Sequence, residues 1–205
     1  PWLQNNTAVV PNTWTQLSGN LVIPASCTVA DVVIFFEGTA AGSDVFVDDV
    51  RVVPPSNNLV GDGGFETGIA GWTSWNGSAL SASTLQARNG AQSLRATGRP
   101  DANQFAVYSL TGRVQAGATY AVSAWAWHTG AATDTVRLAA KVGCASGDTF
   151  PWLHNNTGVA PNTWTQLSGN LVIPAGCSVV DVAIFFEGTT VGSDVFVDDV
   201  SVMPL

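Results

Sequence analysis

The chain has 205 residues and a formal net charge of −8, with a single lysine, Lys141. So few basic residues argue against a nucleic-acid partner or an anionic membrane surface, which both need clustered Lys and Arg. Hydrophobic residues make up 46% of the chain and eight residues are tryptophan, a composition that excludes a disordered chain. No apolar run approaches the roughly 20 residues of a membrane-spanning helix. The length allows one or two folded domains with a proper core.

The first 50 residues recur almost unchanged at residues 151–200, and only nine of the fifty positions differ. A repeat fixes the unit of folding, and the offset makes that unit about 150 residues long. Residues 57–150 occur once, directly before the second occurrence. We therefore predict the incomplete trailing part of one unit at 1–55 and a complete unit at 56–205. Residues 1–50 are called the first copy and residues 151–200 the second copy.

Segment 1–53 contains strand-like runs near 13–22, 31–38 and 44–53. A few exposed strands are not expected to be stable alone. Their unpaired edges would seek a neighbour, because such edges template further pairing. We therefore expect segment 1–53 to be ordered against another chain or an upstream half-unit, which would make the protein a homo-oligomer.

Short strands are expected throughout the complete unit, separated by turn signals such as Arg88-Asn89-Gly90. No segment keeps a 3.6-residue hydrophobic period beyond two turns, so no helix is predicted. Regular short strands with polar turns predict an all-β fold, a β-sandwich of the jelly-roll kind. The expected strands lie near 79–86, 92–98, 104–110, 118–128, 135–143, 162–172, 180–188 and 194–203.

Alternation along two of these strands places large aromatic residues on the less apolar face. In 180–188, Phe185 and Glu187 share one side, opposite Phe186. In 118–128, Trp127 lies opposite a row of smaller apolar residues. A two-layer sandwich buries only one face of each sheet. The aromatic side chains on the second face are therefore either extra packing or a binding platform.

Residues that could support catalysis are few. His128 and His154 have no matching nucleophile motif, and the first copy has glutamine in place of His154. A glycosidase needs two carboxylates at a defined separation, but Glu66 lies in a glycine-rich segment that suits a structural role better. No Walker loop, CxxC pair or HExxH motif is present. We expect a protein that is not an enzyme.

The three cysteines follow the repeat. Cys27 and Cys177 correspond between the two copies, whereas Cys144 lies in the part that occurs once. The economical interpretation is a Cys144–Cys177 disulfide within the complete unit, with Cys27 lacking its partner; the alternative is three free buried thiols. Low charge and the abundance of Gly, Thr, Ser, Asn and Val suit a secreted bacterial β-protein, extracellular or on the cell surface, where disulfides persist.

Six short motifs of the complete unit, in this order, resemble carbohydrate-binding modules of the families 4, 9 and 22 group, which accompany xylanases and glucanases. The resemblance spans 57–203, and its trailing part spans 1–53 again, so it implies tandem copies. The motifs are Asn58–Glu66 (NLVGDGGFE), Gly71-Trp72, Ser93–Arg99 (SLRATGR), Tyr120–Trp125 (YAVSAW), Trp164–Gly169 (WTQLSG) and Phe196–Val200 (FVDDV).

The resemblance implies a jelly roll with a structural calcium ion that ties the N-terminal segment to the last strand. The matching positions are Glu66 and Asp198 as carboxylates, with backbone carbonyls near Gly64 and Gln92. A hard cation of this kind takes several oxygen ligands. The alternative is that Asp198 caps an edge strand.

The resemblance also implies a ligand cleft across a concave sheet, where aromatic rings stack on sugar rings and polar groups bind their rims. Trp72, Trp125 and Trp164 are interpreted as core residues because they lie in framework motifs, and Trp75 is left open. A tryptophan often found shortly after the Gly-Arg pair in related xylan binders is absent, which weakens an assignment to xylan. The expected ligand-binding residues are Trp127, Trp152, Phe150, Phe185, Glu187, Arg99 and Gln104.

These expectations give one main functional prediction and one alternative. The main prediction is a non-catalytic module that binds a β-linked polysaccharide, such as xylan, β-glucan or cellulose, and tethers an enzyme to it. Repetition would then add avidity. The alternative is a structural subunit of an extracellular surface layer or filament built from tandem jelly rolls.

Overall fold

A computed structural model describes residues 10–17, 19, 21, 31–38, 40, 42–50 and 57–205. The chain forms two compact units, Pro1–Val52 and Val53–Leu205. The second unit contains eleven strands. They are β1 (Trp72–Thr73), β2 (Ala79–Ser83), β3 (Ser93–Thr97), β4 (Ala106–Ser109), β5 (Thr119–His128), β6 (Asp134–Cys144), β7 (Gly147–Thr149), β8 (Trp152–Val159), β9 (Thr165–Val172), β10 (Val179–Gly188) and β11 (Val195–Pro204).

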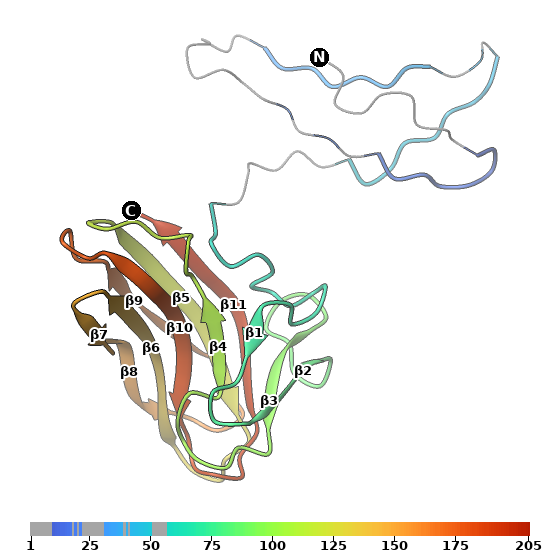
Figure 1. Ribbon diagram of the computed structural model, residues 1–205. Coiled ribbons are helices and arrows are strands. Elements are labelled where there is room, and N and C mark those ends of the chain that lie inside the picture. Colours follow the sequence, from blue (N-terminus) through green and yellow to red (C-terminus); the bar gives the residue numbers. More distant parts are fainter. Residues whose placement is uncertain are drawn as a thin grey trace. The chain divides into compact units, whose positions relative to one another are not determined.

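The strands form two antiparallel sheets that pack face to face (Figure 1). The first sheet has the order β1-β4-β10-β6-β7, with β8 also paired to β6, and the second has the order β2-β3-β11-β5-β9. Neighbours in each sheet come from distant parts of the chain, as in β10 between β4 and β6. The predicted all-β sandwich is thereby confirmed.

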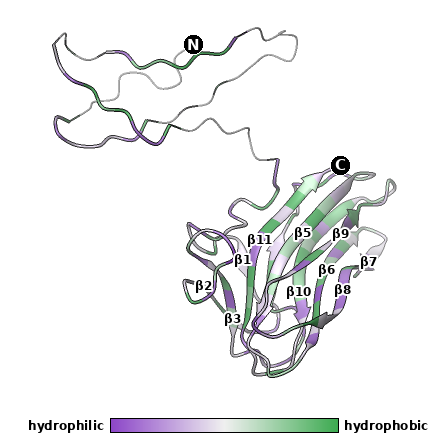
Figure 2. Ribbon diagram, turned by 180° about the vertical axis from the view of Figure 1, so that it is seen from behind, coloured by the Kyte–Doolittle hydropathy of each residue, from purple (hydrophilic) through white to green (hydrophobic). Residues whose placement is uncertain are grey.

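Alternation along the strands builds the core between the sheets. On β10, Val182, Ile184 and Phe186 point inward and are fully buried. On β5, Val122 and Ala124 do the same from the other sheet. Figure 2 shows the resulting hydrophobic stretches along the central strands β5 and β11. The period-2 patterning of the sequence therefore assigned the inward faces correctly.

The eight strands expected in the complete unit are all present, whereas β1, β7 and β8 were not expected. The most consequential of the three is β8, which holds Trp152 and pairs with β6 with two shifts of register. Its sequence, WLHNNTGV, has few branched residues and several polar ones. β8 is a strand because the edge of β6 is available to it, which a local pattern does not reveal.

The N-terminal segment of the unit lies against the end of β11. The Leu59 amide donates to the Val202 carbonyl at 2.9 Å, and the Val200 amide donates to the Gly63 carbonyl at 2.8 Å. A Cβ atom on Gly63 would lie 1.9 Å from the Val200 carbonyl oxygen, so only glycine allows this approach. The glycine-rich entry segment is thus required by close packing of backbone on backbone.

The predicted Cys144–Cys177 disulfide is confirmed, with a Cα–Cα distance of 5.2 Å. It joins the end of β6 to the turn between β9 and β10. Cys27 lies outside the described residues.

None of the described residues of the first unit belongs to a strand, although strands were expected near 31–38 and 44–53. Their apolar side chains are exposed, including Phe35 (71%) and Phe46 (78%). A strand needs a neighbour for its backbone groups, and these segments have no strand partner within the described part of their unit. Among the described residues no helix is long and apolar enough to cross a membrane.

Candidate functional site

The outer face of the first sheet combines apolar and charged side chains. On β10 the residues that point away from the core are Asp181, Ala183, Phe185 and Glu187, opposite the inward set. Their cross-strand partners on β6 include Arg137 and Lys141. Because paired residues share a face, these side chains from β6 and β10 lie together.

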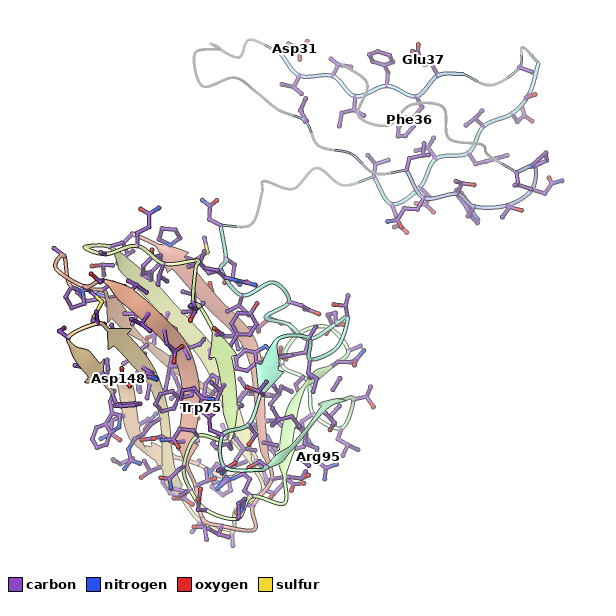
Figure 3. The ribbon with its side chains drawn as sticks, viewed as in Figure 1. Asp31, Phe36, Glu37, Trp75, Arg95 and Asp148 are labelled. Carbon is purple, nitrogen blue, oxygen red and sulfur yellow. A yellow bond between two sulfur atoms is a disulfide. The ribbon has the colours of Figure 1, made fainter. Side chains whose placement is uncertain are left out.

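A small apolar floor lies at the centre of this face. Val107, Ala139, Ala183 and Phe185 form a buried cluster separate from the main core. The Trp75 ring packs on Phe185 with 5.6 Å between centroids. Trp75 itself is 45% exposed, and Figure 3 shows it over the strands of this sheet. Its backbone amide donates to the Gln104 carbonyl at 3.1 Å, which fixes the loop that carries it.

A polar group from β6, β8 and β10 lies beside this floor. The Trp152 indole nitrogen donates to Glu187 Oε1 at 3.0 Å. The Arg137 guanidinium lies 4.6 Å from the centre of the Trp152 ring and 3.8 Å from Glu187 Oε1. Arg137 Nε also donates to Asn155 Oδ1 at 2.8 Å. These contacts hold the Trp152 ring in a defined orientation. Trp152 is 57% exposed, so the ring remains accessible to a ligand.

A second charged group joins β6, β7 and β10. Lys141 Nζ lies 2.8 Å from Asp181 Oδ2 and 3.2 Å from Asp148 Oδ2; Asp148 is labelled in Figure 3. The hydrogen bond from Lys141 holds the pKa of Asp181 below its ordinary value. The same contacts raise the pKa of Lys141. The lysine is therefore neutralised by two carboxylates and adds no net positive charge to the face.

The structure brings three of the predicted ligand-binding residues to this face: Trp152, Phe185 and Glu187. Phe185 is almost fully buried, so it supports the floor and Trp75 rather than offering a ring of its own. Phe150 is exposed directly before β8, and Gln104 contributes its carbonyl to the Trp75 loop. Trp75, which sequence reasoning left open, lies on the same face, packed on Phe185.

Arg99 does not reach the face. Its side chain is only 2% exposed, and Nη2 donates to the carbonyls of Gly188 (3.0 Å) and Thr189 (2.9 Å). Nη1 also hydrogen-bonds the Thr189 hydroxyl. Burial lowers the pKa of Arg99. In this structure the guanidinium holds the end of β10, away from Trp152 and Glu187.

Trp127 lies on the other sheet. It is paired with Phe196 of β11 in the second sheet, packs edge-on against that ring at 5.2 Å and is only 7% exposed. It therefore faces away from Trp152, on the opposite side of the sandwich. Trp72 is buried as expected. Trp125 and Trp164 are only half-buried, and the Arg88 guanidinium stacks on Trp125 at 3.8 Å.

The two carboxylates expected to bind calcium contact one loop, residues 86–92. The Glu66 carboxylate accepts the amides of Ala91 and Gln92, each at 3.0 Å. Asp198 Oδ2 accepts the Arg88 amide at 2.8 Å. Asp198 is fully buried, and burial raises its pKa. The Arg88 side chain binds the neighbouring Asp199 instead.

The Glu66 and Asp198 carboxylates are oxygen donors, the kind of ligand that a hard cation prefers. Within the described part of the chain no ion pair involves Asp198, so a cation would offset a buried carboxylate. The described residues contain no group of three or more His, Cys, Asp or Glu side chains able to hold a metal. A calcium ion would thus need backbone carbonyls, of which those of Gly64 and Gln92 are the candidates.

The arrangement on the first sheet supports binding rather than bond cleavage. Its one glutamate, Glu187, is committed to Trp152 and Arg137, and Glu66 belongs to the loop described above. An accessible indole ring beside hydrogen-bonding charged groups matches the two surfaces of a sugar, its apolar ring face and its hydroxyl rim.

The chain matches known proteins over most of its length. Endo-1,4-beta-xylanase A of Thermotoga neapolitana is 30% identical over 213 residues, which is 95% of this chain and 19% of the xylanase. Endo-1,4-beta-xylanase A of Thermoanaerobacterium saccharolyticum is 27% identical over 175 residues, 77% of this chain and 14% of the xylanase. The chain thus spans less than a fifth of the length of these relatives.

Two solved structures share the fold. The C-terminal family 22 carbohydrate binding module of Clostridium thermocellum Xyn10B gives a TM-score of 0.65 at 22% identity, over 74% of this chain and 97% of the module. The CBM22-1 xylan-binding domain from Paenibacillus barcinonensis Xyn10C gives 0.62 at 22% identity, over 75% and 97%. The family model described as a carbohydrate binding domain matches residues 57–192. The chain therefore belongs to this family of carbohydrate-binding domains.

Proposed function

We propose that the second unit binds a xylan chain, without cleaving it, across the outer face of the first sheet. The observation that carries the proposal is the exposed Trp152 ring, oriented by Glu187 and Arg137 next to the apolar floor under Trp75. Each indole could stack on a sugar ring, while Glu187 and Asn155 bind hydroxyl groups. The names of the matched xylanases and of the xylan-binding domain support xylan among the β-linked polysaccharides.

The matched relatives also suggest how the binding would be used. Since this chain corresponds to less than a fifth of each xylanase, a binding unit of this size would hold a larger catalytic protein on its substrate. A linked binding site raises the local concentration of substrate without any new catalytic contact. Xylan is an extracellular polymer, and the Cys144–Cys177 disulfide suits an oxidising compartment. Secretion is therefore part of the proposal.

A structural calcium ion between Glu66 and Asp198 is a second part of the proposal. The buried Asp198 carboxylate supports it, as does the shared contact of both carboxylates with loop 86–92. The ion would supply positive charge at this loop and tie it to β11. It would have no direct role at the sugar-binding face.

Affinity electrophoresis through xylan, mixed-linkage glucan and a soluble cellulose derivative tests the sugar proposal. The wild-type chain should be retarded most by xylan. Trp152→Ala should abolish most of the retardation, because a stacked aromatic ring at an interface contributes about 1 to 3 kcal/mol. Trp125→Ala, on the outer face of the other sheet, is the matched control and should migrate like the wild type.

Two outcomes would contradict the proposal. If no polysaccharide retards the wild-type chain, sugar binding by this unit is wrong and assembly into a surface layer or filament becomes the better hypothesis. If Trp125→Ala abolishes retardation and Trp152→Ala does not, the sugar binds on the second sheet. A circular dichroism melt of each variant confirms that the variants are folded.

A further inference from the structure

We propose that a charged group on the outer face of the first sheet makes this face select xylan with neutral side branches over xylan whose branches carry uronic acid carboxylates. The group consists of Lys141, Asp148 and Asp181 and is called the Lys141 group. The inference rests on the proposed binding of xylan at this face and names the class of xylan that is bound. The observation that carries it is that the more exposed part of the group is its two carboxylates.

The Lys141 group borders the apolar floor under Trp75. Successive outward positions of β6 hold Arg137, Ala139 and Lys141, and Ala139 belongs to the floor. Lys141 is also the cross-strand partner of Ala183, another floor residue. At a rise of about 3.4 Å per residue, Arg137 and Lys141 are about 14 Å apart along the strand. A sugar chain on the floor would therefore have a charged group on either side, within reach of its branches.

Two features of the backbone bring both carboxylates to Lys141. Asp181 of β10 and Asp148 of β7 are both cross-strand partners of Gly143 on β6. A Cβ atom on Gly143 would lie 2.8 Å from the Asp181 carbonyl oxygen and 3.0 Å from Asp148 Oδ1, so the missing side chain allows this approach. The pairing of β10 with β6 also shifts register between Val179 and Asp181, and such an irregularity changes the direction of a side chain.

Both carboxylate oxygens of Asp181 have a partner. Oδ2 lies 2.8 Å from Lys141 Nζ, and Oδ1 accepts a hydrogen bond from the Thr111 hydroxyl at 3.1 Å. The Thr111 hydroxyl in turn accepts the Val182 amide at 3.0 Å. An asparagine at position 181 would keep an oxygen for Thr111, so the charge of this residue can be removed while its position is retained.

The carboxylates of the Lys141 group lie nearer to solvent than the ammonium group. The side chains of Asp148 and Asp181 are 46% and 41% exposed, whereas that of Lys141 is 21% exposed. A branch that extends over the group would therefore meet the carboxylates first. Hydroxyl groups of a neutral sugar can donate hydrogen bonds to carboxylate oxygens, whereas an ionised uronic acid offers only acceptors there and is repelled.

Arg137, on the other side of the floor, does not offset this negative charge. Its guanidinium lies 3.8 Å from Glu187 Oε1 and 4.6 Å from the centre of the Trp152 ring, and Nε donates to Asn155 Oδ1 at 2.8 Å. The charge of Arg137 is thus balanced by Glu187. Because Lys141 is paired with two carboxylates, the charge that remains in excess beside the floor is negative, the same sign as that of the whole chain.

A purely structural role accounts poorly for this arrangement. Partly exposed ion pairs add little to stability, and one carboxylate is enough to pair with Lys141. The second carboxylate adds repulsion from the first, which lies close to the same ammonium group. What the second carboxylate does supply is the negative charge presented to a ligand.

A matched pair of polymers separates charge from shape. Xylan with uronic acid branches is titrated into the full chain by calorimetry, as such and after its carboxylates have been reduced to alcohols. The measurement is the ratio of the two association constants, reduced polymer over native polymer, because any loss of folded protein affects both equally. At low ionic strength the wild-type ratio should be about two to five, the size of interactions between exposed charges. It should fall towards one at high salt.

Two changes in the Lys141 group should move this ratio in opposite directions. Asp148→Asn combined with Asp181→Asn leaves the ammonium group unpaired, so the native polymer should bind more tightly and the ratio should fall below one. Lys141→Gln leaves two unbalanced carboxylates and should raise the ratio about twofold above the wild-type value. Asp194→Asn is the matched control, because Asp194 pairs with Arg95 of the second sheet, and its ratio should equal that of the wild type.

The outcomes distinguish this inference from the proposed function. If both polymers bind the wild-type chain equally, or the native polymer binds more tightly, charge selection is wrong while xylan binding stands. A ratio that neither change in the Lys141 group moves, or that Asp194→Asn moves as far as the double change, also contradicts a role of this group. If neither polymer binds, xylan binding itself is wrong and the inference fails with it.

Discussion

Residues with the same chemistry have different roles in this sandwich, and their burial distinguishes them. Arg137 is partly exposed and orients Trp152 and Glu187, whereas Arg99 is buried and holds two carbonyls at the end of β10. Thr189, which Arg99 contacts, has φ 58°, a conformation that a β-branched residue rarely adopts. Arg99 therefore stabilises an unfavourable local backbone.

Replacing Arg99 with methionine should lower the stability of the second unit by about 2 to 4 kcal/mol, because buried carbonyls would lose their donors. Xylan affinity measured by calorimetry on the folded fraction should stay within about twofold of the wild type. Thermal and urea unfolding give the stability. Lost affinity at unchanged stability would show instead that Arg99 contacts the ligand.

Among the elements, loop 86–92 is held by carboxylates from two other segments. Glu66 binds its C-terminal half and Asp198 its N-terminal half. A cation between these carboxylates would couple the entry segment, the loop and β11. The same aspartate occurs in the first copy as Asp48, but the counterpart of Glu66 is not part of that copy.

Calcium removal with EDTA should lower the Tm of the second unit without preventing folding. A ligand that binds only the native state stabilises it by about 2.7 kcal/mol at a hundredfold excess over its dissociation constant. Asp198→Asn and Glu66→Gln should abolish the response to calcium. Asp48→Asn is the matched control and should respond like the wild type. A wild-type Tm that is the same with and without EDTA would rule out the calcium site.

At the scale of the whole molecule, acidic residues outnumber basic ones, and several carboxylates are held by hydrogen bonds in the charged form. Lys141 lowers the pKa of Asp181. For Asp134, burial acts to raise the pKa, but hydrogen bonds from Thr190 and Thr135 outweigh it and the pKa is lowered. A carboxylate whose pKa is lower in the folded state than in the unfolded state stabilises the fold when the pH is above its unfolded pKa.

The stability that Asp134 and Asp181 contribute should therefore be lost on acidification, beginning near pH 4 to 5 and continuing as the pH drops through their folded pKa values. Because Asp181 is partly exposed, its share should be about 1 kcal/mol or less. Tm recorded from pH 7 to pH 3 in EDTA checks this. Asp181→Asn should flatten the curve, and Asp31→Asn, its first-copy counterpart, should not; equal slopes for all three chains would contradict the assignment.

Local sequence determined the all-β class, the repeat, eight of the eleven strands and the inward faces, because period-2 alternation and turn residues are properties of neighbouring residues. It also gave the Cys144–Cys177 pair, since the repeat assigned the third cysteine a counterpart. The resemblance placed Trp152, Phe185 and Glu187 among the expected ligand-binding residues, and the structure has all three at one face, with Phe185 buried beneath Trp75.

Tertiary structure decided the rest. Alternation tells which side of a strand Trp127 occupies, but not that β5 belongs to the second sheet, whose outer face points away from Trp152. It likewise gave no sign that β8 would pair with β6 or that Arg99 would be buried against Gly188 and Thr189. These outcomes depend on strand order and on contacts between residues far apart in the chain, which a local pattern does not contain.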